Sequence, residues 1–361
     1  MKILRSAFFY FILFVGSVLC LSSCGDDDVA PIAPGTEGFF VVNEGLFGSG
    51  NASLSFFDKE TNTLSNNVFA AANDRPLGDQ AQSMEVFNER GYIVVQNSAT
   101  IEIIDPDTFE SIQTITAQDG IISPRYFLGV SADKGYITDW GTTSVLVMDL
   151  NTFEITKSIP TGSGPNRMIM VGDRVFVANS GGFGRANTVT VINTTTDQVI
   201  SNIEVDDNPR SLQVAGSGNI WLACFGHTAV DQDFNWDQDN STLGSIIEMD
   251  VDGNIITRIQ MPEVTFFAGP DNLLVDIITS TFYYIYNGAV YSIKNTDTEA
   301  PSTPFINTGF YGISLDPSTG NIIGADAGNF TTAGNIQIFD DSGAMISEHT
   351  SGVAPNGCAF R

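Results

Sequence analysis

Three arginines recur at nearly equal distances in a chain that has few cations. Arg125, Arg167 and Arg210 are separated by 42 and 43 residues, and each follows a Pro directly or after one residue. The sequence holds 15 Lys and Arg against 42 Asp and Glu, so three guanidinium groups at one place would be unusual. A guanidinium fork donates to carboxylate, phosphate or amide oxygens in fixed geometry. If the chain folds in repeats of this length, the spacing predicts a shared binding site.

Aromatic and amide side chains occur at related positions. Flat apolar surfaces and amides would complement a guanidinium fork in a ligand site. The alternative is that each Arg pairs with an Asp of a neighbouring repeat, as repeated structural residues often do. Both roles can hold together. The predicted ligand-binding residues are Arg125, Arg167, Arg210, Trp140, Asn179, Phe225 and Asn356.

An acidic segment offers a second candidate site. Ca²⁺ takes six to eight oxygen ligands, and alternating Asp and Asn could supply them. The EF-hand pattern fails, because Trp236 stands where its Gly belongs and Thr242 replaces its bidentate Glu. A solvated acidic insertion is the alternative interpretation. The residues of this possible Ca²⁺ site are Asp231, Asp233, Asn235, Asp237 and Asp239.

Catalytic patterns are sparse, so we expect no enzyme. His227 and His349 are the only histidines, and they lack metal-ligand spacing. No nucleophile elbow, phosphate-binding loop or dinucleotide-binding unit is found. A lactonase- or lyase-type propeller enzyme stays a third alternative, with a metal held by Asp139, Asn179, Asn287 and Asp326.

A repeat of four short strands must position these residues. Apolar runs that end in Asp or an equivalent residue recur seven times, at spacings of 47, 44, 44, 57, 42 and 48 residues. Strands at this period without helices indicate propeller blades. The clearest blade has strands at 126–131, 135–139, 144–149 and 154–159, joined by Asp and Thr turns that we expect to be structural.

Counting the strands predicts how the ring closes. The first blade, which begins at Phe39, lacks an inner strand, and the last inner strand, at 357–361, lacks a blade. Placing one in the other gives an all-β, seven-bladed propeller closed by the C-terminal strand. The loops before each inner strand and after each second strand then share one face, called the top face. All seven predicted ligand-binding residues fall at or beside these loops.

The N-terminal residues have the features of an export signal. Lys2 and Arg5 precede an apolar run that ends in Leu21-Ser22-Ser23-Cys24, which resembles a bacterial lipobox. We therefore expect a lipoprotein signal peptide at 1–23, lipidation of Cys24, a flexible tether at 24–37 and the propeller at 38–361. The acidic run Asp26-Asp27-Asp28 resembles a surface-export signal, so the expected location is the outer face of the outer membrane, held only by the lipid anchor.

The net charge and the cysteines lead to two further predictions. Loss of Lys2 and Arg5 with the signal peptide would change the net charge from −27 to −29. Such a charge disfavours nucleic acid as a partner. Cys224 and Cys358 could pair, but we expect two buried thiols.

The repeats resemble a known group. Tyr136 to Gly141, Val145 to Asp149 and Gly164 to Arg167 are similar to YncE-like seven-bladed propellers, over essentially residues 38–361. With the lipobox and acidic leader, the chain resembles BtuG-type and DUF5074-like surface lipoproteins of Bacteroidota. The resemblance implies a binding protein that captures a small molecule, with a corrinoid or other tetrapyrrole as the leading candidate, and passes it to a TonB-dependent transporter. A protein–protein interaction scaffold is the main alternative.

Overall fold

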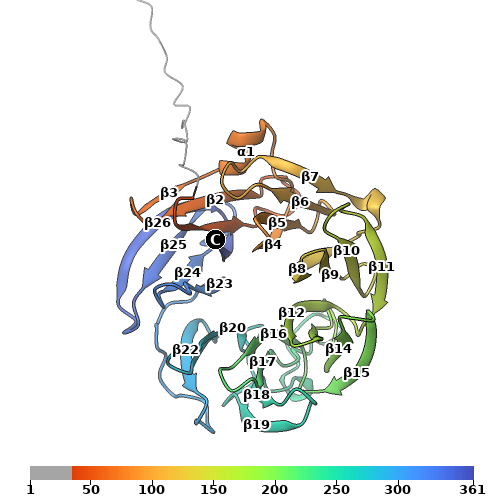
Figure 1. The fold of residues 1–361 in the computed structure, drawn as a ribbon. Helices are drawn as coiled ribbons and strands as arrows, with labels where there is room; N and C mark the ends of the chain where they lie inside the picture. Colours follow the sequence, from red (N-terminus) through yellow and green to blue (C-terminus); the bar gives the residue numbers. More distant parts are fainter. Residues whose placement is uncertain (1–34) are drawn as a thin grey trace, which may run out of the picture.

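The computed structural model describes residues 35–361, which form a ring of seven antiparallel sheets around a central axis (Figure 1). The predicted signal peptide, Cys24 and nearly all of the predicted tether lie outside the described residues. Within residues 35–361, no helix is both long and apolar enough to span a membrane.

The strands follow the predicted order, from an inner strand at the axis to an outer strand at the rim. Blade 1 contains β27 (Pro355–Phe360), β1 (Gly38–Asn43), β2 (Ser53–Asp58) and β3 (Thr63–Ser65). Blade 2 contains β4 (Ala81–Phe87), β5 (Arg90–Val95), β6 (Thr100–Ile104) and β7 (Ser111–Ile115). Blade 3 contains β8 (Pro124–Ser131), β9 (Lys134–Asp139), β10 (Ser144–Asp149) and β11 (Ile155–Pro160). Blade 4 contains β12 (Pro165–Val171), β13 (Arg174–Asn179), β14 (Thr188–Asn193) and β15 (Gln198–Glu204).

The remaining blades complete the ring. Blade 5 contains β16 (Pro209–Val214), β17 (Ile220–Cys224), β18 (Ser245–Met249) and β19 (Ile255–Gln260). Blade 6 contains β20 (Asp271–Asp276), β21 (Thr281–Tyr286) and β22 (Ala289–Lys294). Blade 7 contains β23 (Gly312–Leu315), β24 (Ile322–Asp326), β25 (Ala333–Phe339) and β26 (Met345–Val353). Three short helical segments lie in connections: α1 (Val68–Asn73), η1 (Ala117–Asp119) and η2 (Gln238–Asn240).

Closure by the C-terminal strand is confirmed. Strand β27 pairs antiparallel with β1, with Phe360 opposite Phe39 and Cys358 opposite Val41. The last residues of the described chain thus complete the blade that its first strands begin. Strand β1 is thereby paired on both sides, by β27 and β2, and does not keep the unpaired edge that an open ring would leave.

Blade 6 departs from the predicted four strands, because its outer position holds only an isolated bridge between Val290 and Ile306. Pro301 and Pro304 precede this bridge. Proline has no N–H to donate to a ladder, so a regular fourth strand is interrupted there.

Packing between blades explains the long apolar runs in the second and third strands. Phe40, Val42 and Leu54 of blade 1 share a buried cluster with Ile93 and Val95 of blade 2. Both faces of each middle strand are therefore covered, and their residues are apolar in succession instead of alternating. The outer strands β11 and β15 each pair with only one strand and expose most of their side chains.

The Asp and Thr turns are structural, as predicted. In the turn after β2, Asp58 Oδ1 accepts from the backbone amides of Glu60 and Thr61 at 2.8 and 3.1 Å. Asp105 and Asp149 repeat the arrangement. The thiols are unpaired, with Cys224 buried and Cys358 partly exposed in another blade. The expectation of two buried thiols is confirmed for Cys224, whereas Cys358 is only partly buried.

Replacement of Arg361 should test how much the C-terminal closure stabilises the ring. Its guanidinium donates to the carbonyls of Thr36 and Pro106, pairs with Asp107 at 2.9 Å and stacks on Phe56 at 4.6 Å. Arg361→Ala should lower the free energy of unfolding by about 1–3 kcal/mol in urea denaturation. Arg174→Ala, which removes an exposed pair with Asp252, is the control. Equal losses in the two variants would contradict the closure role.

Candidate functional site

The top-face end of the axial channel is formed by irregularities that the blades share. In six blades the pairing of the inner strand with the second strand shifts register near the start of the inner strand. Four of these inner strands begin with Pro, which cannot donate to the ladder. A bulge frees its residue from pairing and redirects its side chain. We call the polar residues at these shifts the top ring: Gln82, Arg125, Arg167, Arg210, Asn272 and Asn356.

Two arginines of the top ring lie against aromatic side chains of their own blades. The Arg125 guanidinium is 4.0 Å from the ring centre of Trp140, and that of Arg210 is 3.5 Å from Phe225. Arg125 Nη1 donates to Gln96 Oε1, and Arg210 Nη1 pairs with Asp271 at 3.1 Å. The alternative of a structural ion pair with a neighbouring blade is therefore realised at Arg210, whereas Arg125 has an amide partner.

Arg167 is brought to the same end of the channel but at a different level. Blade 4 shifts register between Pro165 and Met168, so two residues occupy its bulge. Asn166 takes the position after Pro that Arg125 and Arg210 hold, and Arg167 lies one residue further along the inner strand. The prediction of three equivalent arginines is corrected here: the equal spacing hides an offset of one residue. Arg167 instead stacks on Tyr126 of blade 3, with 4.8 Å between guanidinium and ring centre.

A buried carboxylate that the sequence analysis missed lies beside the arginines. Glu44 accepts from Tyr311 Oη at 2.7 Å and from Gln80 Nε2 at 2.9 Å. Burial is the largest influence on the pKa of Arg125 and lowers it, while Glu44 and Tyr311 raise it and Arg210 lowers it. These influences show that the groups lie within electrostatic reach of one another. Arg125 and Arg210 thus lie close to Glu44 and Asp271, so this end of the channel carries charges of both signs.

The amide and carboxylate residues at the ends of the second strands are occupied inside the blades. Asn179 is fully buried and donates to Thr188 Oγ1 and Thr190 Oγ1 at 3.0 and 2.9 Å. Asp139 accepts from the backbone amides of Ile122, Ser123 and Thr142. These contacts hold the top-face loops in place. Asn179 is therefore not brought to the channel with the three arginines.

Asn356 belongs to the top ring but already has partners. Its Nδ2 donates to the carbonyls of Ala81 and Gln82 at 3.0 and 3.2 Å, which ties the C-terminal strand to blade 2. Its remaining surface lines the channel.

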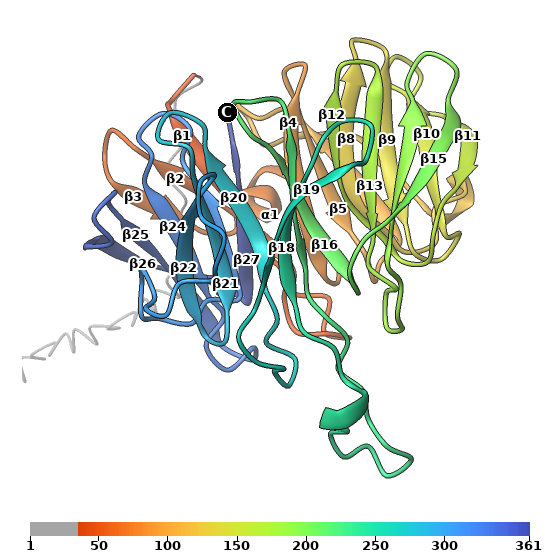
Figure 2. The same cartoon turned by 90° about the horizontal axis from the view of Figure 1, so that it is seen from below.

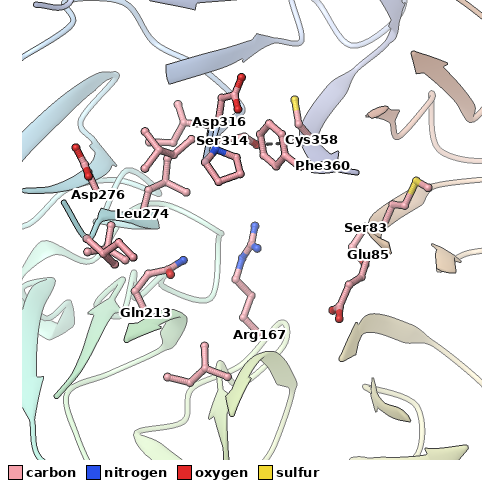
Figure 3. A pocket seen from close by; sticks show the side chains of 18 of the residues that line it. Ser83, Glu85, Arg167, Gln213, Leu274, Asp276, Ser314, Asp316, Cys358 and Phe360 are labelled. Carbon is pink, nitrogen blue, oxygen red and sulfur yellow. Dashed lines mark hydrogen bonds between the residues drawn. The ribbon is translucent and has the colours of Figure 1, made fainter. Parts of the chain in front are cut away.

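The axial channel holds a cavity of about 740 Å³ that extends from the top ring towards the opposite face. Arg167 and Tyr126 line its upper part, and the turns at 276–279 and 316–320 line its lower end. Figure 3 shows Arg167 and Glu85 directed into this space from different walls. Burial raises the pKa of Glu85 to about 7, opposed by the Gly129 amide, which donates to its carboxylate at 3.0 Å.

The acidic loop between β17 and β18 projects from the top face, away from the disc (Figure 2, teal). Its carboxylates serve local structure. Asp231 accepts from the amides of Asp233 and Asn235, and Asp237, which caps the start of η2, accepts from the amide of Asn240. No group of three or more His, Cys, Asp or Glu that could hold a metal occurs in the part of the chain that the structure describes. Neither the Ca²⁺ site nor the metal of the enzyme alternative gains support, and both stay predictions.

Exposed aromatic side chains are concentrated on the top face. Within residues 35–361, all the exposed Phe, Trp and Tyr lie in loops before inner strands or after second strands. Some pack against other rings, such as Trp236 against Phe266 at 5.8 Å and Phe183 against the half-buried Trp140 at 5.5 Å. We call this set the aromatic crown: Phe47, Phe183, Phe234, Trp236, Phe266, Phe267, Tyr311 and Phe330.

The fold defines the class: a seven-bladed β-propeller with a polar, arginine-bearing opening to its channel. The family model described as "Domain of unknown function (DUF5074)" matches residues 37–351, and the chain belongs to this family. The DUF5074 part of the predicted resemblance is thereby confirmed. No curated protein matches the sequence significantly.

Solved propeller structures share the fold at low sequence identity. A quinonprotein alcohol dehydrogenase-like protein from Bacteroides thetaiotaomicron is 14% identical, with a TM-score of 0.66 over 90% of this chain and 78% of that chain. A protein from Lactobacillus plantarum is 15% identical, with a TM-score of 0.64 over 90% and 99%. AztD from Citrobacter koseri is 11% identical, with a TM-score of 0.53 over 89% and 96%.

The raised pKa of Glu85 should make the stability of the protein depend on pH. The ordinary pKa of this group is 4.5, and burial raises it to about 7 in the folded protein. The folded protein then binds the proton more tightly than the unfolded chain, so the free energy of unfolding should fall as pH rises between these values. Glu85→Gln should remove this part of the dependence and be more stable than the parent above pH 7, by about 1–3 kcal/mol. Urea denaturation from pH 4 to 9 measures it, with exposed Glu154→Gln as control. Parallel curves for parent and Glu85→Gln would show that Glu85 titrates normally.

Proposed function

We propose that this protein is a non-catalytic, surface-anchored binding protein whose top face captures a small molecule. The leading candidate is a corrinoid or similar tetrapyrrole, which the protein would pass to a TonB-dependent transporter of the outer membrane. The location and the transporter follow from the lipobox and the family resemblance.

The arrangement of the top ring is the observation that supports ligand capture. Three guanidinium groups stand at one end of the channel, each against an aromatic ring. A stacked guanidinium keeps its edge free to donate to amide, carboxylate or phosphate oxygens. Corrinoids and other tetrapyrroles carry such oxygens around a flat macrocycle. Trp140 and Tyr126 are partly exposed and offer flat apolar surface beside the donors.

Calorimetric titration with cobalamin and cobinamide tests the proposal. Residues 35–361 complete every blade, so this part of the chain can be used alone. We expect saturable heat, and Arg210→Gln should weaken binding by about tenfold or more, the usual effect of losing a charged hydrogen bond. The matched control is Arg90→Gln, because Arg90 also stacks on an aromatic ring, Phe153 at 4.9 Å, but at the opposite face. Absence of heat with both compounds would remove the corrinoid, and equal loss in the two variants would remove the top-face site.

The aromatic crown favours docking of a protein partner on the same face. Exposed Phe and Trp are enriched at protein interfaces, and such a one-sided set is unusual for a surface in water alone. Docking is compatible with transfer to a transporter and is also what the interaction-scaffold alternative requires.

A photo-crosslinking amino acid tests the docking face in cells. Placed at Phe183, it should capture one defined outer-membrane protein. Placed at Ile278, which is equally exposed but belongs to a turn on the opposite face, it should not. Identical capture from both positions would argue against a docking face.

A further inference from the structure

Arg167 stands apart from the other buried or half-buried cations of the protein. Within residues 35–361, most of these cations have a carboxylate partner, such as Arg75 with Glu102 and Lys134 with Asp197. Arg125 has the Gln96 amide, and Arg90 donates to the Leu150 carbonyl. Arg167 has its contact with the Tyr126 ring and, among the described residues, neither an ion pair nor a hydrogen-bond partner for its guanidinium. The sequence has 42 Asp and Glu, yet none of the described ones pairs with the guanidinium of Arg167.

The surroundings of Arg167 keep the fork available to a ligand. The doubled bulge of blade 4 places it below the level of Arg125 and Arg210, where it lines the upper part of the cavity. Figure 3 shows its guanidinium reaching into the open space of the cavity. Tyr126 covers one face of the guanidinium, and Gln82 Nε2 lies 3.5 Å from Tyr126 Oη. The ring is thus held in position while the N–H edge of Arg167 stays uncovered.

Nearby acids do not neutralise this group. Glu85 lines the same cavity, but its carboxylate accepts from the Gly129 amide and forms no ion pair with Arg167. The cavity also has apolar walls, which are formed by Leu212, Leu274 and Ile169. A charged fork that is stripped of part of its water and lacks an internal anion gains most from an anion that enters from outside.

We propose that Arg167 is the anchor for an oxyanion of the ligand, a carboxylate or a phosphate, that enters the axial channel through the top ring. The proposal rests on ligand capture at the top face and specifies its chemistry. The body of the ligand lies over Arg125, Arg210 and Trp140, and one acidic arm reaches down to Arg167. The role of Arg167 is specificity: ligands without an oxyanion lose this contact and keep the others.

The direct test uses simple anions as probes, so it does not depend on the identity of the ligand. Residues 35–361 are titrated with inorganic phosphate and, separately, with acetate, while the Nε–H signals of arginine are followed by NMR. We expect a saturable shift of the Arg167 signal, identified by its loss in Arg167→Gln. Saturation by phosphate alone identifies a phosphate arm, and saturation by acetate identifies a carboxylate arm. Arg174, exposed and paired with Asp252, is the internal control. No shift of Arg167, or the same linear shift at Arg174, would overturn the proposal.

A second experiment separates the role of Arg167 from the corrinoid proposal. Cobalamin carries a phosphodiester and cobinamide does not. If both bind, Arg167→Gln should weaken cobalamin about tenfold or more and change cobinamide by less than about twofold. Arg167→Lys should recover only part of the loss, because an ammonium keeps the charge without the fork. Equal weakening of both compounds would overturn the role of Arg167 and leave ligand capture standing. If neither compound binds, the corrinoid falls, and the phosphate and acetate titrations decide the role of Arg167.

Discussion

The pairing of β27 with β1 is the constraint on which the rest of the structure depends. It joins residues from the two ends of the described chain in one sheet, and Arg361 then ties the closing strand to Thr36 and Asp107. With the ring closed, each inner strand packs between two others, and seven equivalent loop positions face a common axis. Residues as distant in sequence as Glu44 and Tyr311 become neighbours only because of this closure. An open arc of the same blades would separate them.

The top ring shows how a regular scaffold produces an irregular site. A perfect strand would alternate its side chains between the two neighbouring blades, whereas a bulge releases one residue to face the channel. Proline at the start of four inner strands makes the bulge inexpensive, because the missing N–H is not needed there. Aromatic rings then fix the released arginines without consuming their donors. Blade 4, like blade 6, has a two-residue bulge, whereas blades 3 and 5 have one-residue bulges, and this difference places Arg167 deeper than Arg125 and Arg210. A pseudo-symmetric fold thereby acquires an asymmetric channel opening.

The fold could be predicted from the sequence because the period, the apolar runs and the turn residues all agree on it. Even closure followed from the unmatched inner strand at 357–361. The site was predicted only in part. Arg125, Arg167 and Arg210 share a face as expected, but the offset of Arg167 depends on register, which spacing alone does not give. Aligning the chain on Pro124, Pro165 and Pro209 would have shown it. Asn179 and Asp139 have suitable chemistry but bond within their blades, a difference that residue type cannot reveal. Glu44 was missed because its partners Gln80 and Tyr311 come from other blades.

Location of the bound ligand tests the central claim most directly. Hydrogen exchange of residues 35–361, measured by mass spectrometry with and without saturating cobalamin, reports which backbone amides a ligand protects. The top-face account predicts slower exchange in the segments 121–127, 163–169 and 206–212, with the turns at 276–279 and 316–320 unchanged. Protection confined to those turns, or the same exchange everywhere with and without the compound, would contradict it.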